Sequence, residues 1–165
     1  MSSVIQAKFK HLSTIYSMIL NLAQFQGILD RIKITRTKLG ELLFCDNPSH
    51  FIALAMVDEK AVGFVMYNVN YSNICFNETP GLYIENLFIQ SEYRHRGIGK
   101  GLLTYVATQA KEKNYTRVEW WVSHQNQPAI NFYKSIGGKA LDEWLIFKCE
   151  EACMNELVGE SNEIN

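Results

Sequence analysis

Three glycines and three basic residues lie within the stretch from Arg94 to Gly101. This stretch stands between a predicted strand and the most regular predicted helix of the chain. The first amides of a helix lack intrahelical acceptors and carry partial positive charge, which favours phosphate. Glycine lets a bulky diphosphate approach the backbone, and cationic side chains add attraction. The stretch therefore predicts a site for a phosphorylated cofactor, in preference to a flexible turn with solvated arginines.

Two other phosphate-binding patterns fit this stretch less well. A Walker loop has the pattern Gly-x-x-x-x-Gly-Lys followed by Ser or Thr. If Gly99-Lys100 is the Gly-Lys pair, this chain has Gly101 in place of Ser or Thr and Arg94 in place of the first glycine. The dinucleotide fingerprint has glycine at its sixth position, where this chain has Leu102. Neither a nucleotide-hydrolysing loop nor a dinucleotide fold is therefore expected.

The predicted elements place the glycine-rich stretch at the start of a helix over 98–114, and a strand follows over 117–123. The order β, α, α, three strands, then α, β, α, β predicts an α/β domain. Its first part is expected to be largely antiparallel and its second to contain a strand-helix-strand unit. The other predicted strands cover 4–9, 51–57, 61–69, 82–89 and 140–149, and the other predicted helices cover 11–26, 35–44 and 128–135.

The strand over 82–89 has a side-chain pattern that simple alternation does not explain. Alternation puts Leu82 and Ile84 on the face opposite Leu87 and Ile89. One extra residue near Asn86 returns these four apolar side chains to one face. The other face then holds Tyr83, Glu85 and Phe88. We therefore expect a β-bulge at 85–87, which would splay the backbone and aim an N–H group at a ligand.

Composition and charge exclude several classes of protein. The 165 residues are 47% hydrophobic and 20% charged, which predicts one domain over 1–149 and an acidic tail over 150–165. The formal net charge of -1 gives no bias toward nucleic acid. The longest apolar run, 51–57, is too short to cross a bilayer, and the N-terminus lacks a signal-peptide pattern. We therefore expect that the protein neither binds nucleic acid nor associates with a membrane.

The four cysteines, Cys45, Cys75, Cys149 and Cys153, are scattered along the chain. They form no CxxC pair, and no histidine stands at ligand spacing from them, so no metal site is predicted. Free thiols in a reducing cytoplasm are expected in preference to disulfides or zinc.

Two segments resemble signatures of the GNAT superfamily of N-acetyltransferases. Arg94-x-x-Gly97-x-Gly99 resembles its coenzyme A-binding motif, and the segment 126–137 (NQPAINFYKSIG) resembles its second signature. Segments 83–89 and 144–148 are similar to the diamine (spermidine/spermine) and thialysine acetyltransferase branch. The resemblance covers roughly 22–148. It implies a GNAT-like α/β fold with a mixed, mostly antiparallel central sheet flanked by helices and a C-terminal β-α-β-α-β portion. It also implies acetyl-coenzyme A as co-substrate and a homodimer.

The resemblance further implies which residues hold acetyl-coenzyme A. Backbone amides over 96–101 bind the pyrophosphate, and the backbone of Leu87 and Ile89 pairs with the pantetheine arm like an added strand. The Asn126 side chain contacts the cofactor or caps its own helix, and Lys134 meets a phosphate or is only solvated. His95 is expected at the loop surface rather than as a base. The predicted cofactor-binding set is Leu87, Phe88, Ile89, Arg94, His95, Arg96, Gly97, Ile98, Gly99, Lys100, Gly101, Asn126 and Lys134.

Two residues match the family's catalytic positions. Glu85 matches a glutamate proposed as general base through water, and a carboxylate there can relay the proton of an ammonium or hold the cation. Tyr133 matches the tyrosine that protonates the leaving thiolate, since a phenol with a pKa of about 10 can donate to sulfur. The plainer interpretations are a surface ion pair for Glu85 and an amphipathic core aromatic for Tyr133.

The predicted activity is acetyl transfer from acetyl-coenzyme A to a primary amine of a small molecule, by direct attack in a ternary complex. The amine is a diamine, a polyamine or a thialysine-like amino acid. Asn86 stands where the diamine branch has a second carboxylate, and Arg31 and Lys33 make one connection basic. A smaller amine or an amino acid is therefore expected in preference to spermine. Two alternatives stay open: a protein or peptide N-acetyltransferase, and a non-catalytic acyl-coenzyme A sensor.

Overall fold

The computed structural model describes residues 2–72 and 74–161. The chain forms two compact units, 1–123 and 124–165. The first unit contains the whole β-sheet together with helices on both of its faces, and the second contains two further helices. The expected single domain over 1–149 with a tail over 150–165 stays a prediction.

The sheet of the first unit has five strands in the order β1-β2-β3-β4-β5. The first four are antiparallel to their neighbours, and β5 runs parallel to β4, which confirms the predicted mixed α/β class. The strands are β1 (Ser2–Gln6), β2 (Phe51–Val57), β3 (Lys60–Asn70), β4 (Gly81–Ile89) and β5 (Val118–Trp120). The helices of this unit are α1 (Leu12–Phe25), α2 (Arg36–Phe44), α3 (Ile74–Asn77) and α4 (Ile98–Glu112), with 3₁₀ turns at Phe9–His11, Leu29–Arg31 and Ser91–Tyr93.

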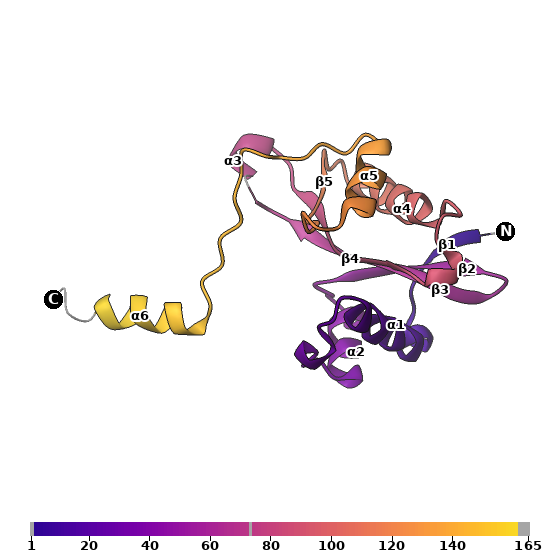
Figure 1. The fold of residues 1–165 in the computed structure, drawn as a ribbon, viewed down its shortest axis with the longest axis horizontal. Helices are drawn as coiled ribbons and strands as arrows, with labels where there is room; N and C mark the ends of the chain where they lie inside the picture. The colour runs from indigo at the N-terminus through magenta and orange to yellow at the C-terminus, as the bar shows by residue number, and fades with distance from the viewer. Residues whose placement is uncertain (1, 73, 162–165) are drawn as a thin grey trace. The chain divides into compact units, whose positions relative to one another are not determined.

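Helices cover both faces of the sheet (Figure 1). On one face α1 and α2 bury Ile15, Met18 and Phe64 in a continuous apolar cluster. On the other face α4 contributes Leu102 and Val106, both with no exposed surface. Apolar surface removed from water is the main term that stabilises such a sandwich. It fixes the position of β4, which carries the candidate site.

Local features define the ends of several elements in the first half of the chain. The side chain of Thr35 accepts a hydrogen bond from the Lys38 amide at 3.2 Å and so caps α2. Gly27, with φ of 69°, follows the end of α1. Asp58 and Glu59 take the left-handed conformation in the short turn that joins β2 to β3.

Three predicted strands need correction. The strand predicted over 4–9 is β1, which covers Ser2–Gln6 and ends before the 3₁₀ turn at Phe9–His11. The predicted strand over 140–149 is wrong, because these residues form no strand in the described chain. A strand is stabilised by its ladder with a neighbour, and the apolar pattern of this segment does not specify one. Its side chains are exposed instead, with Leu145 at 80% and Phe147 at 88%. The strand predicted over 117–123 exists but extends only over Val118–Trp120.

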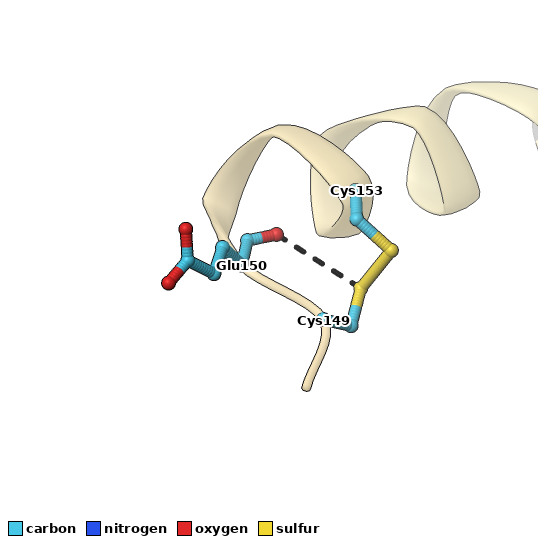
Figure 2. The surroundings of a disulfide bond; sticks show 3 residues. All are labelled: Cys149, Glu150 and Cys153. Carbon is cyan, nitrogen blue, oxygen red and sulfur yellow. Dashed lines mark hydrogen bonds between the residues drawn. A yellow bond between two sulfur atoms is a disulfide. The ribbon is translucent and has the colours of Figure 1, made fainter. Parts of the chain in front are cut away.

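The second unit consists of α5 (Gln127–Ser135), an extended segment and α6 (Glu151–Ser161). Cys149 and Cys153, at the start of α6, form a disulfide with a Cα–Cα distance of 5.5 Å (Figure 2). The expectation of free thiols was wrong for this pair, because a spacing of four residues at a helix start brings the two sulfurs together. Cys45 and Cys75 carry free thiols, as expected.

Candidate active site

Strand β4 contains the predicted bulge. On the neighbouring β3, Met66 pairs with Asn86 and Tyr67 pairs with Ile84, so Glu85 is an extra residue without a partner. The extra residue restores one apolar face to the strand, as the side-chain pattern predicted. On the opposite face Phe88 packs into the cluster beneath α1 and α2. The bulge thus turns a carboxylate outward from a strand that is otherwise largely buried.

Glu85 is held by two neighbours on its own side of the sheet. Its Oε1 accepts a hydrogen bond from Asn68 Nδ2 at 2.8 Å and lies 2.8 Å from His50 Nε2. The other ring nitrogen of His50, Nδ1, lies 2.7 Å from Ser49 Oγ. The Glu85 side chain is 31% exposed, so it is fixed in orientation yet open to a ligand.

A cavity of about 570 Å³ opens beside Glu85. Its size suits a small organic molecule rather than a single ion. The walls come from the far end of β3, from β4 and from β5, so every wall belongs to the first unit. The lining residues are Asn68, Asn70, Ser72, Tyr83, Glu85, Glu119 and Trp121.

Glu119 brings a second carboxylate to this cavity. It pairs with Tyr83 across the parallel ladder between β4 and β5. Its Oε2 accepts hydrogen bonds from Asn70 Nδ2 at 2.7 Å and from Arg117 Nε at 3.1 Å. Burial, and to a smaller extent the charge of Glu85, raise the pKa of the Tyr83 phenol, so this wall residue stays a neutral hydroxyl at ordinary pH.

The edge of β4 that faces β5 is open beyond the bulge. The parallel ladder ends at Ile84 and Trp120, and no described residue of β4 after Ile84 pairs with β5. Backbone groups at such an edge accept an added strand. The predicted cofactor residues Leu87, Phe88 and Ile89 lie along this stretch, although Phe88 directs its side chain into the core.

The glycine-rich stretch forms the start of α4, as predicted. Gly97 is the residue before the helix and has φ of 78°, while His95 is exposed with φ of 61°. No side chain caps α4, so the amides of its first turn lack a side-chain acceptor. Gly99 and Lys100 lie in that turn, and the side chain of Ile98 is buried beneath it. This geometry suits an anion at the helix start.

The three basic residues of the stretch differ in what they contact. Arg94 donates from Nε to the Ile89 carbonyl at 3.0 Å and stacks over the Phe25 ring at 4.5 Å. Its guanidinium therefore ties the loop to β4 and α1. Arg96 and Lys100 are exposed, and Arg96 lies 5.4 Å from the Tyr93 ring centre. Arg96 and Lys100 are the cations that face solvent beside the start of α4.

Gly101 lies within α4, where the helix faces β1. A Cβ atom at this position would lie 3.7 Å from Val4 Cγ2 of β1, which is an ordinary contact. Packing therefore does not require glycine at position 101, and alanine would fit there.

The second unit holds the remaining predicted residues. Asn126 caps α5 by accepting a hydrogen bond from the Ala129 amide at 3.3 Å, so its capping role is observed. Tyr133 lies on the same helix at 5.4 Å from the Phe132 ring, and burial raises the pKa of its phenol. Lys134 is exposed. Backbone hydrogen bonds from Gly137 to the Lys134 carbonyl and from Gly138 to the Tyr133 carbonyl end the helix.

Four residues near Glu85 were missed by the sequence reasoning: His50, Asn68, Glu119 and Trp121. A usable signal existed for two of them. Alternation along the strand predicted over 117–123 puts Val118, Trp120 and Val122 on one face, which leaves Glu119 and Trp121 on the other. His50 follows a turn and Asn68 lies in a strand, and their approach to Glu85 depends on the register between distant segments.

The described residues lack two further kinds of feature. No group of three histidine, cysteine, aspartate or glutamate residues there is placed to hold a metal ion. Among the same residues, no helix has the length and apolar character needed to span a membrane.

Comparisons with known proteins agree with this geometry. The model of the acetyltransferase (GNAT) family matches residues 19–137. Thialysine N-epsilon-acetyltransferase of Sus scrofa is 29% identical over 97% of this chain and 100% of its own length. L-ornithine N5-acetyltransferase NATA1 of Arabidopsis thaliana is 42% identical over 57% of this chain, and the match spans only 40% of that relative. The solved structure of AAC(6')-Iy in complex with the bisubstrate analog CoA-S-monomethyl-acetylneamine has a TM-score of 0.77 at 21% identity, covering 92% of this chain and 99% of that one.

Proposed function

The chain belongs to the acetyltransferase (GNAT) family, and from this premise we propose that it transfers acetyl from acetyl-coenzyme A to a primary amine of a small molecule. Relatives named for thialysine and ornithine acetylation support a small amine as acceptor. One observation carries the proposal most directly. A carboxylate on a strand bulge, Glu85, lines a polar cavity on the strand that leads to the glycine-rich helix start.

The residues of the first unit fit coenzyme A. The first-turn amides of α4 and the exposed side chains of Arg96 and Lys100 would hold its pyrophosphate. The open edge of β4 from Leu87 to Ile89 would pair with the pantetheine arm. When bound, the coenzyme supplies an acetyl thioester, which a neutral amine attacks directly in a ternary complex.

Glu85 would prepare the amine for that attack. An amine is largely protonated at neutral pH, so a base must accept a proton before nitrogen can act as a nucleophile. Both described hydrogen bonds to Glu85 end on Oε1. No described residue bonds to Oε2, so this oxygen can contact the substrate or a bridging water. His50, bonded to Glu85 and Ser49, orients the carboxylate and offers a route for the proton.

Tyr133 would donate the proton that the departing thiolate needs. Burial raises the pKa of this phenol, so it is protonated throughout the neutral range and available as an acid. Asn126 and Lys134, on the same helical element, complete the predicted cofactor contacts.

The protein is further proposed to act as a homodimer in the cytoplasm. The exposed apolar run of Trp144, Leu145, Ile146 and Phe147 supports burial against a second copy of the chain. The free thiols of Cys45 and Cys75 support a reducing compartment, whereas the Cys149–Cys153 bond weighs against it. Light scattering of the full chain and of Leu145→Asp tests the dimer, since the variant should be monomeric; a monomeric wild-type chain would refute it.

Thiol release from acetyl-coenzyme A, corrected for hydrolysis, tests the activity on a panel of diamines, polyamines, thialysine, lysine and short peptides. Turnover with small amines is the expected result. Turnover with peptides alone would establish the peptide N-acetyltransferase alternative. Stoichiometric binding of coenzyme A without turnover of any amine would establish the sensor alternative.

A further inference from the structure

The cavity beside Glu85 is acidic, and this charge bears on the choice of amine. Of its seven lining residues two are glutamates, two are aromatic and three are neutral polar residues. No lysine, arginine or histidine is among these described lining residues. Such walls favour a cation and offer no positive charge to a carboxylate.

The nearest arginine offsets part of the charge of Glu119, but its donors are already bonded, and Glu85 keeps the cavity acidic. Arg117 donates from Nε to Glu119, from Nη1 to the Thr79 carbonyl at 2.8 Å, and from Nη2 to the Ser72 carbonyl at 2.5 Å. Its side chain is only 16% exposed and lies behind Glu119. A substrate carboxylate would have to displace these bonds to reach the guanidinium. Arg117 therefore holds Glu119 in place and contributes no free cationic donor to the cavity.

The two glutamates that line the cavity have the same hydrogen-bonding pattern. Both described bonds to Glu85 end on Oε1, and both described bonds to Glu119 end on Oε2. Each carboxylate therefore has one oxygen that no described residue bonds and that a ligand can reach. Glu119 is level with Tyr83, two positions before Glu85, so the Cα atoms of the two glutamates are about 8 Å apart by strand geometry. A short alkyl chain with an amine at each end spans such a separation.

The aromatic residues add to the preference for a second cation. Tyr83 and Trp121 meet edge to face with ring centres 5.5 Å apart, and Trp121 is 67% exposed. Aromatic faces attract ammonium groups. Tyr83 pairs with Glu119 across the ladder between β4 and β5, and Trp121 directly follows β5, whereas His50 and Asn68 hold Glu85.

We infer that the cavity selects an unbranched diamine without a carboxylate, with Glu85 at the reacting amine and Glu119 at the distal ammonium. The inference rests on the proposed function and narrows it. It also departs from the amino-acid substrates for which the relatives are named. In an α-amino acid the distal ammonium stands beside a carboxylate, which Glu119 repels.

Three probes of matched length test the inference: butylamine, putrescine and ornithine. Putrescine adds a distal amine to butylamine, and ornithine adds a carboxylate to putrescine. Initial rates of thiol release should give putrescine a kcat/KM at least about tenfold above both others, a factor that matches one hydrogen bond to a charged group. Ornithine equal to or better than putrescine would overturn the inference while leaving the acetyltransferase activity intact.

Glu119→Gln tests the contribution of the Glu119 charge. The glutamine keeps an oxygen that can accept from Arg117 Nε but loses the charge. It should lower kcat/KM for putrescine about tenfold and leave butylamine within about twofold. Equal losses for both amines would mean a structural role and would overturn the assignment. Glu59→Gln, which removes the same charge at the β2–β3 turn, is the matched control and should change neither rate.

Binding separates failure of this inference from failure of the proposed function. Should no amine turn over, the activity proposal fails, and calorimetric titration of putrescine and ornithine into the wild-type chain still tests selectivity. Tighter binding of putrescine, weakened by Glu119→Gln, supports the inference. Equal affinities for the two ligands overturn it.

Discussion

The Nε2 atom of His50 lies 2.8 Å from Oε1 of Glu85, and this contact joins the residue before β2 to the bulge in β4. Asn68 reaches the same oxygen, so the carboxylate is fixed from two sides. The imidazole is itself held by Ser49. Under the proposed mechanism His50 positions Glu85 and would continue the path by which a proton leaves the cavity.

His50→Ala tests this role. We expect kcat to fall roughly tenfold with little change in coenzyme A affinity, because the carboxylate loses one of its two fixed partners. The loss should be larger near neutral pH than at high pH, where the amine is already neutral. His50→Gln, which can still donate to Glu85, should recover part of the rate. An unchanged kcat and pH profile in His50→Ala would exclude the role.

Glu85→Gln tests the base itself. The variant keeps the shape of the side chain but cannot accept a proton, so turnover at neutral pH should fall about 100-fold. At high pH the substrate is a free amine and the loss should be smaller. Glu85→Asp, which retains a carboxylate, is the companion variant and should retain more activity than the amide. The same loss at every pH would leave Glu85 as a cation-holding residue only.

Gly97→Ala tests the loop that begins α4. A side chain at φ of 78° is strained although the space around it is open, so the free energy of unfolding should fall by about 1 kcal/mol. Relief of that strain would shift the first-turn amides, and calorimetry should show about tenfold weaker binding of coenzyme A.

Gly101→Ala is the matched control for Gly97→Ala. Its Cβ would meet Val4 at an ordinary distance inside the helix, so stability should be retained or raised and coenzyme A affinity kept. Equal affinities for coenzyme A in both variants would argue against a special role for the Gly97 conformation.

Buried tyrosines predict how stability changes with alkaline pH. Burial, reinforced by the neighbouring Tyr105, raises the pKa of Tyr67 well above its ordinary value. The unfolded chain therefore ionises first as pH rises, so the folded state loses stability above about pH 10 and is unaffected below it. Urea unfolding between pH 8 and pH 11 should show this loss, and Tyr67→Phe should reduce its slope. A stability that stays flat to pH 11 in the wild-type chain would contradict the prediction, and Tyr71→Phe, at an exposed ring, is the control.

Much of the fold follows from local pattern. The helices predicted over 11–26 and 35–44 correspond to α1 and α2. In α1 the buried Leu12, Ile15 and Leu22 recur at helical spacing, and Thr35 caps α2. The bulge at Glu85 was predictable because alternation along a strand is strict, so a mismatch in the apolar pattern requires an extra residue.

The remaining features depend on contacts between distant segments. Segment 140–149 has a strand-like composition, but a strand also needs a partner, which composition does not name. Glu119 reaches the cavity because it is in register with Tyr83, and His50 reaches Glu85 across 35 positions of sequence. Such contacts are set by the register of the whole sheet. Local alternation puts Glu119 on the face opposite Trp120, but it does not specify which residue of the neighbouring strand Glu119 meets.

Tyr133→Phe tests the proposed acid. Removing only the hydroxyl should leave α5 folded and coenzyme A affinity unchanged, because phenylalanine keeps the ring that packs near Phe132. The thiolate would then leave without a proton donor, and kcat should fall about 100-fold. Since burial raises the pKa of this phenol, the wild-type rate should not decline from its ionisation until pH exceeds about 10, where the acid begins to be lost.

Circular dichroism and calorimetry check the fold and the binding, and stopped assays of thiol release give the rate. Phe132→Leu, which changes the neighbouring ring and keeps the hydroxyl, is the companion variant and should retain most activity. Undiminished turnover in Tyr133→Phe would exclude this tyrosine as the acid and leave solvent to protonate the thiolate.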